Sequence, residues 1–248
     1  MTTSHLDALF NPRSIALIGA GDGAGSIGAA LAANLLKSAK AGFKGKIMAV
    51  HPALKEVGGH RAWPDIASLP EVPDLGLVCA PADRVPGIVD DLGARGTRAA
   101  VVITAGFGER HAADGTQRLR AVQAAAARHG LRLVGPNCLG LLVPGRGLNA
   151  SFAHRMPAAG KLAFVAQSGA IVTSVIDWAI PRGIGFSHLV SLGDMAVVGL
   201  GDVLDHLAGD PSSRGIRLYI EAVTDARRFR SAARAAARRK PGIVVKGG

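Results

Sequence analysis

The sequence predicts an α/β fold with two doubly wound domains, of which the first is Rossmann-like. Short runs rich in β-branched residues alternate with longer helical patterns along the 248 residues, and such alternation produces parallel sheets covered by helices on both faces. Glycine is abundant (33 residues) while aromatic residues make up only 4%, which favours tight helix-to-sheet packing over aromatic-rich β-sandwiches or barrels. The alternation stops and later restarts, which indicates two sheets.

The expected elements of the first domain follow one another in strand and helix order. Strands are expected at residues 14–18, 46–50, 75–79, 99–104 and 131–134, and helices at 28–40, 85–94 and 114–129. Each strand run is short and apolar, as is typical of strands buried on both faces of a parallel sheet. Because crossovers between such strands are right-handed, the helices are expected to cover both faces.

A stretch rich in glycine, proline and asparagine separates the two domains. From Gly135 to Gly160 the composition suits a connection rather than a regular element. Beyond it, strands are expected at 162–166, 186–191, 216–221 and 243–246, and helices at 170–180, 200–208 and 225–239. The predicted organisation is a domain over residues 1–135, a connection over 136–160 and a second domain over 161–248, both domains having parallel sheets.

The sequence also indicates the cellular compartment in which the protein is expected. Apolar runs, such as residues 99–105, are interrupted well before the roughly 20 residues needed to cross a bilayer, and the first residues lack the pattern of a secretory signal. A cytoplasmic protein with no membrane partner is expected. The two cysteines, Cys79 and Cys138, are too few for a metal-binding quartet, so we expect buried free thiols and no metal site.

The net charge of +11 is concentrated near the end of the sequence. Arg227, Arg230, Arg234 and Arg238 recur at helical spacing in an alanine-rich run, which predicts a basic stripe on one helix face. Only one aromatic residue, Phe229, lies among these arginines, and no groove-binding motif accompanies them. We therefore expect a solvated face and no nucleic-acid partner.

A glycine-rich loop follows the first strand and opens the first helix. Within it, Gly23, Gly25 and Gly28 have the spacing GxGxxG. Glycines allow the backbone to approach an anion closely, while the free N–H groups and the dipole at a helix N-terminus stabilise a phosphate. The order of strand, loop and helix predicts a phosphate or nucleotide site.

The end of the second strand indicates which nucleotide the loop holds. NAD sites need an acidic residue there to bind the ribose hydroxyls, but the strand ends in Val50-His51-Pro52. The surroundings are basic instead, with Lys44, Lys46 and Lys55 nearby. A phosphorylated ribose is favoured, as in NADP or coenzyme A, and NAD is disfavoured.

Several ordered motifs resemble those of one family. They are Phe-Asn-Pro-Arg-Ser-Ile-Ala-Leu-Ile-Gly-Ala at 10–20, Gly-Ser-Ile-Gly at 25–28, Gly-Pro-Asn-Cys-Leu-Gly at 135–140, Gly-Lys-Leu at 160–162, Gln-Ser-Gly at 167–169, Ser-Leu-Gly-Asp at 191–194 and Leu-Tyr-Ile-Glu at 218–221. Together they resemble the CoA-binding and first ligase domains of NDP-forming acyl-CoA synthetases, relatives of the succinyl-CoA synthetase α subunit. Residues 221–246 are particularly similar to the synthetase-like region of bacterial protein acetyltransferases fused to a GNAT domain. The resemblance implies a Rossmann-like CoA-binding domain followed by a flavodoxin-like domain.

The resemblance also implies roles for individual residues. The glycine loop would hold the CoA pyrophosphate, residues after the second strand would lie near the adenosine, and the ends of later strands would line the pantetheine path. The implied CoA-binding residues are Gly19, Ala20, Gly21, Gly25, Ser26, Gly28, Pro52, Lys55, Ala80, Pro81, Thr104, Ala105, Gly106 and Asn137. Ser168, Gly169 and Ala170 match the helix N-terminus that binds the transferred phosphate, and Glu221 matches the carboxylate that pairs with a phosphorylated histidine.

The histidine that carries phosphate in the family lies in a loop shortly after the strand that here spans 243–246, and the eight histidines of this sequence lie elsewhere. The expected function is the CoA- or acyl-CoA-binding part of an acid–thiol ligase, incomplete for catalysis, with ATP or ADP and Mg²⁺ handled only by an ATP-grasp partner. A homo-oligomer is also expected. The alternative is an acyl-CoA-sensing region fused to a GNAT acetyltransferase, and an NADP-dependent oxidoreductase is the third hypothesis.

Overall fold

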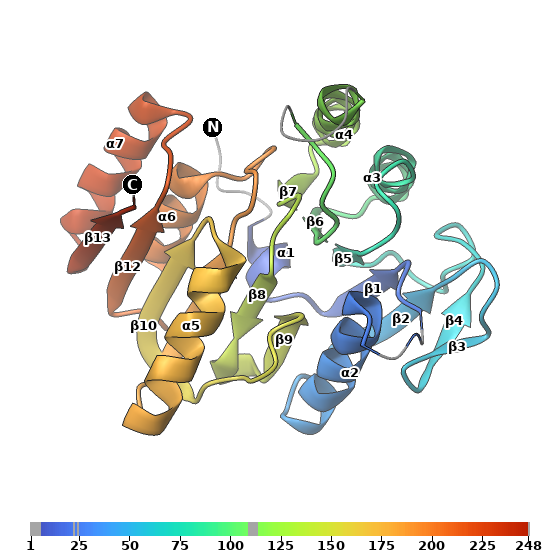
Figure 1. The fold of residues 1–248 in the computed structure, drawn as a ribbon, viewed down its shortest axis with the longest axis horizontal. Helices are drawn as coiled ribbons and strands as arrows, with labels where there is room; N and C mark the ends of the chain where they lie inside the picture. Colours follow the sequence, from blue (N-terminus) through green and yellow to red (C-terminus); the bar gives the residue numbers. More distant parts are fainter. Residues whose placement is uncertain (1–5, 22, 24, 109–113, 248) are drawn as a thin grey trace.

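The computed structural model describes residues 6–21, 23, 25–108 and 114–247 and arranges them around two sheets. Figure 1 shows the first sheet on the right and the second on the left, with helices packed on both. The two expected α/β halves are therefore confirmed.

The first sheet has the strand order β3-β4-β2-β1-β5-β6-β7. Its strands are β1 (Ser14–Ile18), β2 (Lys46–Val50), β3 (Glu56–Val57), β4 (His60–Trp63), β5 (Leu75–Val78), β6 (Ala99–Val102) and β7 (Arg132–Val134), and its helices are α2 (Ile27–Lys40), α3 (Val85–Ala94) and α4 (Gly115–His129). Pairing is parallel from β4 through to β7. Every residue of β1, β5 and β6 is buried, which explains why these strands are apolar apart from Ser14 at the start of β1.

A small hairpin at the edge of this sheet was not expected. Strand β3 has only two residues and pairs antiparallel with β4, whose residues are partly exposed. Its sequence, Glu-Val-Gly-Gly-His-Arg-Ala-Trp, contains no apolar run. The hairpin forms because β4 pairs with the edge of β2, and that contact is not visible in the local sequence.

The second sheet has the strand order β13-β12-β10-β11-β8-β9. Its strands are β8 (Gly140–Val143), β9 (Leu148–Ser151), β10 (Ala159–Ala166), β11 (Phe186–Ser191), β12 (Gly215–Ile220) and β13 (Gly242–Lys246), and its helices are α5 (Gly169–Ala179), α6 (Leu200–Gly209) and α7 (Ala226–Ala237). Strands β10 to β13 pair in parallel. The expected strands and helices of this half are all present within one or a few residues of their predicted bounds.

The expectation of a connection without regular elements over 136–160 is wrong. Strands β8 and β9 lie in this stretch, form an antiparallel hairpin around the short turn η1 (Pro144–Arg146) and join the second sheet through antiparallel pairing with β11. All of their residues are buried. They were missed because four-residue strands flanked by glycine and proline have the composition of a loop. The second sheet is consequently mixed rather than parallel throughout, while the domain boundaries themselves stay a prediction.

The two halves share one core. A short helix, α1 (Asp7–Phe10), buries Leu9 and Phe10 in a cluster that includes residues of both sheets. On α2, the buried Asn34 donates hydrogen bonds from Nδ2 to the carbonyls of Ser151 and Ala153, each at 2.8 Å. Because an unpaired buried amide is costly, these bonds fix α2 of the first half against β9 of the second.

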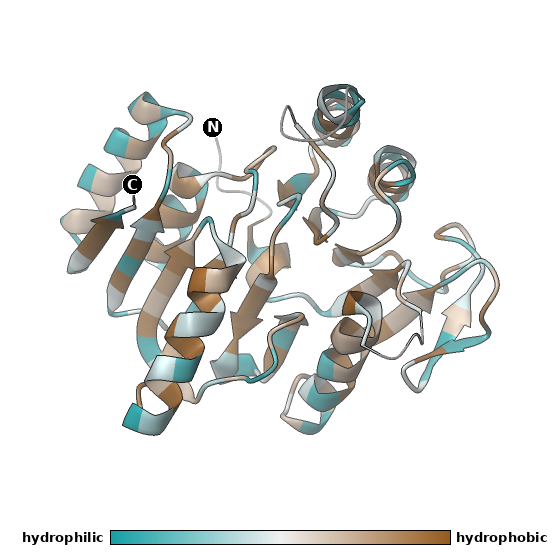
Figure 2. Cartoon of the chain, in the orientation of Figure 1, coloured by the Kyte–Doolittle hydropathy of each residue, from teal (hydrophilic) through white to brown (hydrophobic). Residues whose placement is uncertain are grey.

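A buried ion cluster also joins the halves. The carboxylate of Asp202 on α6 accepts hydrogen bonds from Arg132 on β7 and from Arg228 on α7, and its side chain is only 3% exposed. Figure 2 shows apolar strands at the centre and helices with alternating apolar and polar surface. In the part of the chain that the structure describes, no helix is long and apolar enough to cross a membrane.

Candidate functional site

A cavity of about 570 Å³ lies where the two halves meet, and we call it the junction cavity. Its lining residues are Ile27, Cys79, Ile103, Thr104, Ala105, Asn137, Cys138, Leu139, Phe152, Gly169, Ala170 and Thr173. They come from the start of α2, the segments after β5 and β6, the segment after β7 and the start of α5. The cavity thus lies at the carboxyl ends of strands of both sheets, where open α/β sheets bind their ligands.

The N-terminus of α2 reaches this site through Ile27, its first residue, which lines the cavity. Ser26 caps the helix, since its Oγ accepts a hydrogen bond from the N–H of Ala29 at 3.1 Å. Gly19 has a φ of +80°, and a Cβ there would lie 2.6 Å from the Cα of Ala80. At Gly28 a Cβ would lie 3.0 Å from the Cα of Ala20. Glycine at these positions allows the loop to pack against the sheet while Ser26 and Ile27 stay exposed; residues 22 and 24 lie outside the described residues.

The N-terminus of α5 forms the other side. Ser168 caps this helix by accepting a hydrogen bond from the N–H of Ile171 at 3.4 Å. Gly169 and Ala170 line the cavity, and a Cβ on Gly169 would lie 3.0 Å from the Cβ of Leu139. A capped helix N-terminus presents N–H groups and a positive dipole end, so the site offers two places that stabilise anions.

Gln167 is a structural residue of this site that the sequence analysis did not single out. Its side chain is buried, and Oε1 accepts hydrogen bonds from the backbone N–H groups of Glu221, at 2.6 Å, and Ala222, at 3.0 Å. Gln167 directly precedes Ser168, so it links the start of α5 to the residue after β12. The signal was available in the sequence, because a polar amide at the end of a buried strand needs a hydrogen-bond partner.

Thr104 and Asn137 connect the walls of the cavity. The hydroxyl of Thr104 donates to the carbonyl of Ala80 at 2.7 Å, and the carbonyl of Thr104 accepts from the N–H of Asn137 at 2.9 Å. The side-chain amide of Asn137 donates to Asp194 at 3.2 Å. The structure therefore brings together three of the residues that the resemblance implies bind CoA: Ala80, Thr104 and Asn137.

Both cysteines line the cavity and both are free. Burial raises the pKa of the Cys79 thiol to about 12, and burial likewise raises the pKa of the Cys138 thiol to about 12. The Cys138 thiol donates to the carbonyl of Val102 at 3.2 Å. Since the thiolate is the reactive form, these raised pKa values keep both groups as thiols at neutral pH and disfavour them as nucleophiles.

Five of the predicted site residues line the cavity: Thr104, Ala105, Asn137, Gly169 and Ala170. The remaining ones lie outside its lining, including Ala80, Ser168 and the residues of the glycine loop, which are Gly19, Ala20, Gly21, Gly25, Ser26 and Gly28. Pro52 and Lys55 are exposed in the loop after β2, where the ring Nδ1 of His51 accepts hydrogen bonds from the N–H groups of Ala53 and Leu54 at 3.2 and 3.0 Å. Pro81 is also exposed. Gly21 and Gly106 are half-buried. Glu221 is exposed at the end of β12, beside the site rather than in its wall.

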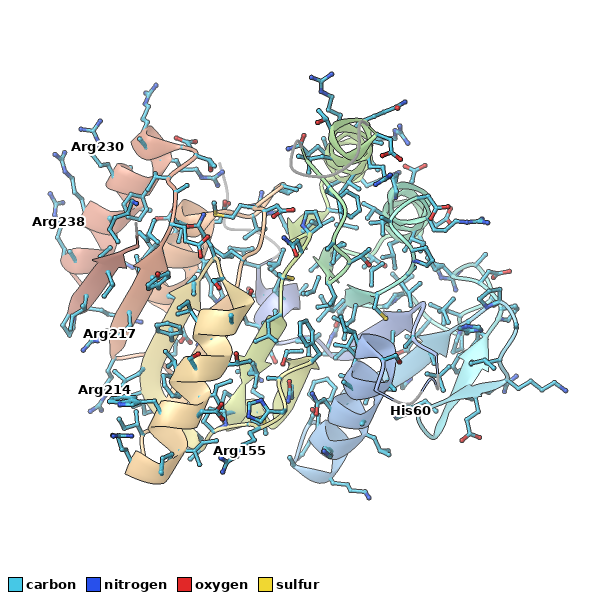
Figure 3. The ribbon with its side chains drawn as sticks, in the orientation of Figure 1. His60, Arg155, Arg214, Arg217, Arg230 and Arg238 are labelled. Carbon is cyan, nitrogen blue, oxygen red and sulfur yellow. The ribbon has the colours of Figure 1, made fainter. Side chains whose placement is uncertain are left out.

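The basic stripe lies on α7, where Arg227, Arg230, Arg234 and Arg238 are all exposed. Figure 3 shows Arg230 and Arg238 pointing away from the helix into solvent. Arg228, one position from the stripe, instead points inward to Asp202. The expectation of an exposed basic helix face is therefore confirmed.

The first half is Rossmann-like and has a glycine loop, and the second α/β half has a capped helix that lines the same cavity. Together these features define a nucleotide-cofactor-binding protein of the two-domain α/β class. Comparison with known families then identifies the two halves. A CoA binding domain matches residues 13–144, and a succinyl-CoA ligase like flavodoxin domain matches residues 159–248. The chain belongs to the family of ADP-forming acyl-CoA synthetases and corresponds to their CoA-binding, α-subunit-like region. The resemblance noted in the sequence and the flavodoxin-like second half are confirmed.

Individual relatives agree with this assignment. The chain is 39% identical over 243 residues to acetate–CoA ligase [ADP-forming] I of Archaeoglobus fulgidus, covering 98% of this chain and 35% of the relative. It is 34% identical over 249 residues to the α subunit of acetate–CoA ligase [ADP-forming] I of Pyrococcus furiosus, covering 98% and 53%. The structure of dinucleotide-forming acetyl-coenzyme A synthetase 1 of Ca. Korarchaeum cryptofilum, in complex with phosphate and ADP, superposes with a TM-score of 0.92 at 34% identity, covering 100% and 52%. The chain thus spans about a third to a half of these relatives.

Proposed function

We propose that this chain binds CoA or a short acyl-CoA in the junction cavity, as part of an ADP-forming acyl-CoA synthetase. The observation that carries the proposal is that two capped helix N-termini, those of α2 and α5, contribute to one cavity. One anion site alone would serve many nucleotides. Two anion sites, separated by a partly apolar wall, suit a ligand with a pyrophosphate at one end and a reacting thioester at the other. This wall is formed by Ile103, Thr104 and Ala105.

In this arrangement each predicted segment has a distinct role. The loop from Ala20 to Gly28 holds the pyrophosphate, and Thr104, Ala105 and Asn137 line the path of the pantetheine arm. Pro52 and Lys55 contact the adenosine end, where a cation complements the phosphorylated ribose. The half-reaction at α5 is attack of a phosphate oxygen on the thioester carbonyl, which forms an acyl phosphate and releases CoA as a thiolate. N–H groups at the start of α5 stabilise the phosphate charge.

The next step requires a group that accepts the phosphoryl from the acyl phosphate. Among the described residues, the lining of the junction cavity includes no histidine, and its two cysteines are neutral thiols. We propose that a histidine from another segment or subunit enters the site, with Glu221 as its partner, and that an ATP-grasp partner holds the nucleotide and Mg²⁺. The relative from Pyrococcus furiosus is named as an α subunit, which supports a partner of this kind.

The alternative of an acyl-CoA sensor fused to an acetyltransferase uses the same CoA site. Several relatives found by comparison are named as CoA ligases, which favours the synthetase. Co-purification with an ATP-grasp subunit, or its presence in the same polypeptide, separates the two.

Isothermal titration of the chain with CoA, acetyl-CoA, NAD and NADP tests the proposal. We expect CoA and acetyl-CoA to bind at least about tenfold tighter than either dinucleotide, a difference of ~1.4 kcal/mol. Lys55→Ala should weaken CoA more than dephospho-CoA, because only CoA carries the ribose phosphate, and the exposed Arg155→Ala serves as a charge-matched control. Tighter binding of NAD or NADP than of CoA would refute the proposal.

A further inference from the structure

A second cavity, of about 790 Å³, lies at the opposite end of the second sheet, and we call it the amino-end cavity. Lys161 at the start of β10, His188 near the start of β11 and Asp210 before β12 line it, together with Arg146 of η1, His206 of α6 and Asp7 of α1. The junction cavity lies at the carboxyl ends of the strands, so the two cavities share no lining residue. The proposed CoA site leaves this second cavity without a role.

A buried polar network forms the floor of the amino-end cavity. Ser213 donates from Oγ to Asp210 Oδ2 at 2.6 Å, and Ser213 Oγ lies 3.3 Å from Nδ1 of His188. Because the hydroxyl proton of Ser213 goes to the carboxylate, its oxygen accepts a hydrogen bond from Nδ1–H of His188. Asp210 also accepts from the hydroxyl of Ser212 at 2.6 Å. The negative charge of Asp210 is therefore satisfied inside the protein.

His188 is held neutral by its surroundings. Burial lowers the pKa of His188 to about 4; Arg146, Lys240 and the His206 ring also lower it, and Asp210 raises it. With the proton on Nδ1, Nε2 of this neutral ring carries a lone pair and can only accept a hydrogen bond. The His188 side chain lines the cavity and is 4% exposed, so the ring offers a neutral acceptor, and no charge, to a ligand that reaches it.

Two cations line the same cavity without a carboxylate partner. Arg146 and Lys161 are exposed, and neither forms an ion pair with any residue of the described part of the chain. The nearby carboxylate of Asp7, whose side chain is 91% exposed, lies 3.9 Å from Nδ1 of His206 and forms no ion pair with either cation. The cavity therefore combines two unneutralised cations with a buried hydrogen-bond acceptor.

We propose that the amino-end cavity binds a phosphate monoester of a small polyol. A phosphate monoester carries about −1.5 to −2 charges at neutral pH, which matches Arg146 and Lys161 together, whereas a carboxylate matches only one of them. The planar guanidinium of Arg146 can bind two phosphate oxygens at once. Hydroxyl groups of the ligand donate to Nε2 of His188 and to Asp7. The volume is within the range of small-molecule sites, roughly 300–1,000 Å³.

Isothermal titration of the 248-residue chain with glycerol 3-phosphate and ribose 5-phosphate tests this site. We expect saturable binding that Arg146→Ala weakens at least about tenfold, since it removes a charge-assisted contact. Arg238→Ala on α7 removes the same charge elsewhere and should change the affinity by less than about twofold. CoA affinity should be the same in both variants, because neither arginine belongs to the proposed CoA site. If the parent chain does not bind CoA at all, that result contradicts the proposed function and leaves this second site unaffected.

Each of the following results would contradict the proposal. Inorganic phosphate binding as tightly as the esters would show an anion site that does not recognise a polyol. Binding of glutamate or glycine in place of the esters would show a site for zwitterions. Ester binding that Arg146→Ala leaves unchanged, or that excess CoA displaces competitively, would place the ligand in the junction cavity.

Discussion

The two helix N-termini at the junction cavity are built in different ways. At the loop before α2, a Cβ on Gly21 or Gly25 would meet nothing within 4 Å, and Ser26 is exposed. At the start of α5, Gly169 packs against Leu139 and the buried Gln167 holds the backbone of Glu221. Backbone freedom therefore shapes the first anion site, while side-chain packing shapes the second.

This contrast matches the two proposed ligand groups. The pyrophosphate of CoA belongs to a large molecule, and an open loop can enclose it without crowding the nucleotide. The transferred phosphate is small, and a rigid helix start holds it in one orientation for attack, which is how positioning contributes to catalysis. Substitutions of the loop glycines before α2 should therefore affect ligand binding, whereas substitutions of the packed residues behind the start of α5 should affect protein stability.

The largest effect is expected for Gly25→Val. This glycine has a φ of +75° in open space, so valine both disfavours the loop conformation and places a branched side chain where the pyrophosphate approaches. CoA affinity should fall by about a thousandfold, or ~4 kcal/mol. Gly42→Val is the matched control, because Gly42 also has a positive φ, of +104°, and open space around it. Equal CoA affinity of a folded Gly25→Val protein would place the pyrophosphate elsewhere.

Acid should destabilise the half that carries α5. His188 has a pKa of about 4 in the folded protein because of its burial, against about 6.5 in the unfolded chain. The unfolded state binds the proton first as pH falls, so stability is unaffected above pH 6.5 and decreases by up to ~3 kcal/mol as pH approaches 4. Urea unfolding between pH 7 and 4.5 measures this slope. His188→Asn should reduce the dependence of the unfolding free energy on pH, whereas the control His154→Asn, at an exposed position, should leave it unchanged. An unchanged pH dependence in His188→Asn would contradict the assignment.

Gln167→Leu should cost about 2 kcal/mol of unfolding free energy, because the N–H groups of Glu221 and Ala222 lose their acceptor in a partly buried position. Gln167→Glu keeps an acceptor oxygen and should cost less. The added negative charge, however, lies beside the start of α5 and should weaken inorganic phosphate binding. Equal unfolding midpoints in urea for Gln167→Leu and the parent would show that the bridge contributes nothing.

The smallest effects are expected for the two capping serines. Ser26→Ala and Ser168→Ala should each lower stability by ~1 kcal/mol, with the smaller loss at Ser168, whose hydrogen bond is longer, 3.4 Å against 3.1 Å. Titration with CoA and with inorganic phosphate separates their roles. CoA affinity should decrease mainly for Ser26→Ala and phosphate affinity mainly for Ser168→Ala, and the reverse pattern would exchange the two assignments.

Features encoded by a few neighbouring residues could be predicted from the sequence. The glycine loop before α2, the capped start of α5 and the buried runs of β1, β5 and β6 each depend on local chemistry, and the structure has them as expected. Strands β8 and β9 were missed because they are stabilised by pairing with β11, far along the chain. The contacts of Gln167 with Glu221 and of Asn34 with Ser151 were missed for the same reason, since they join residues 54 and 117 positions apart.

Asn34 gives the site a property that neither helix has alone. It lies on α2, which directly follows the loop proposed to hold the pyrophosphate, and it fixes that helix to the strand hairpin beside α5. The two proposed anion sites are therefore held at a fixed spacing. A CoA-type ligand would have to span that spacing with its flexible pantetheine arm. We therefore expect the protein to discriminate between acyl carriers by the length of this arm, whatever acyl group they bear.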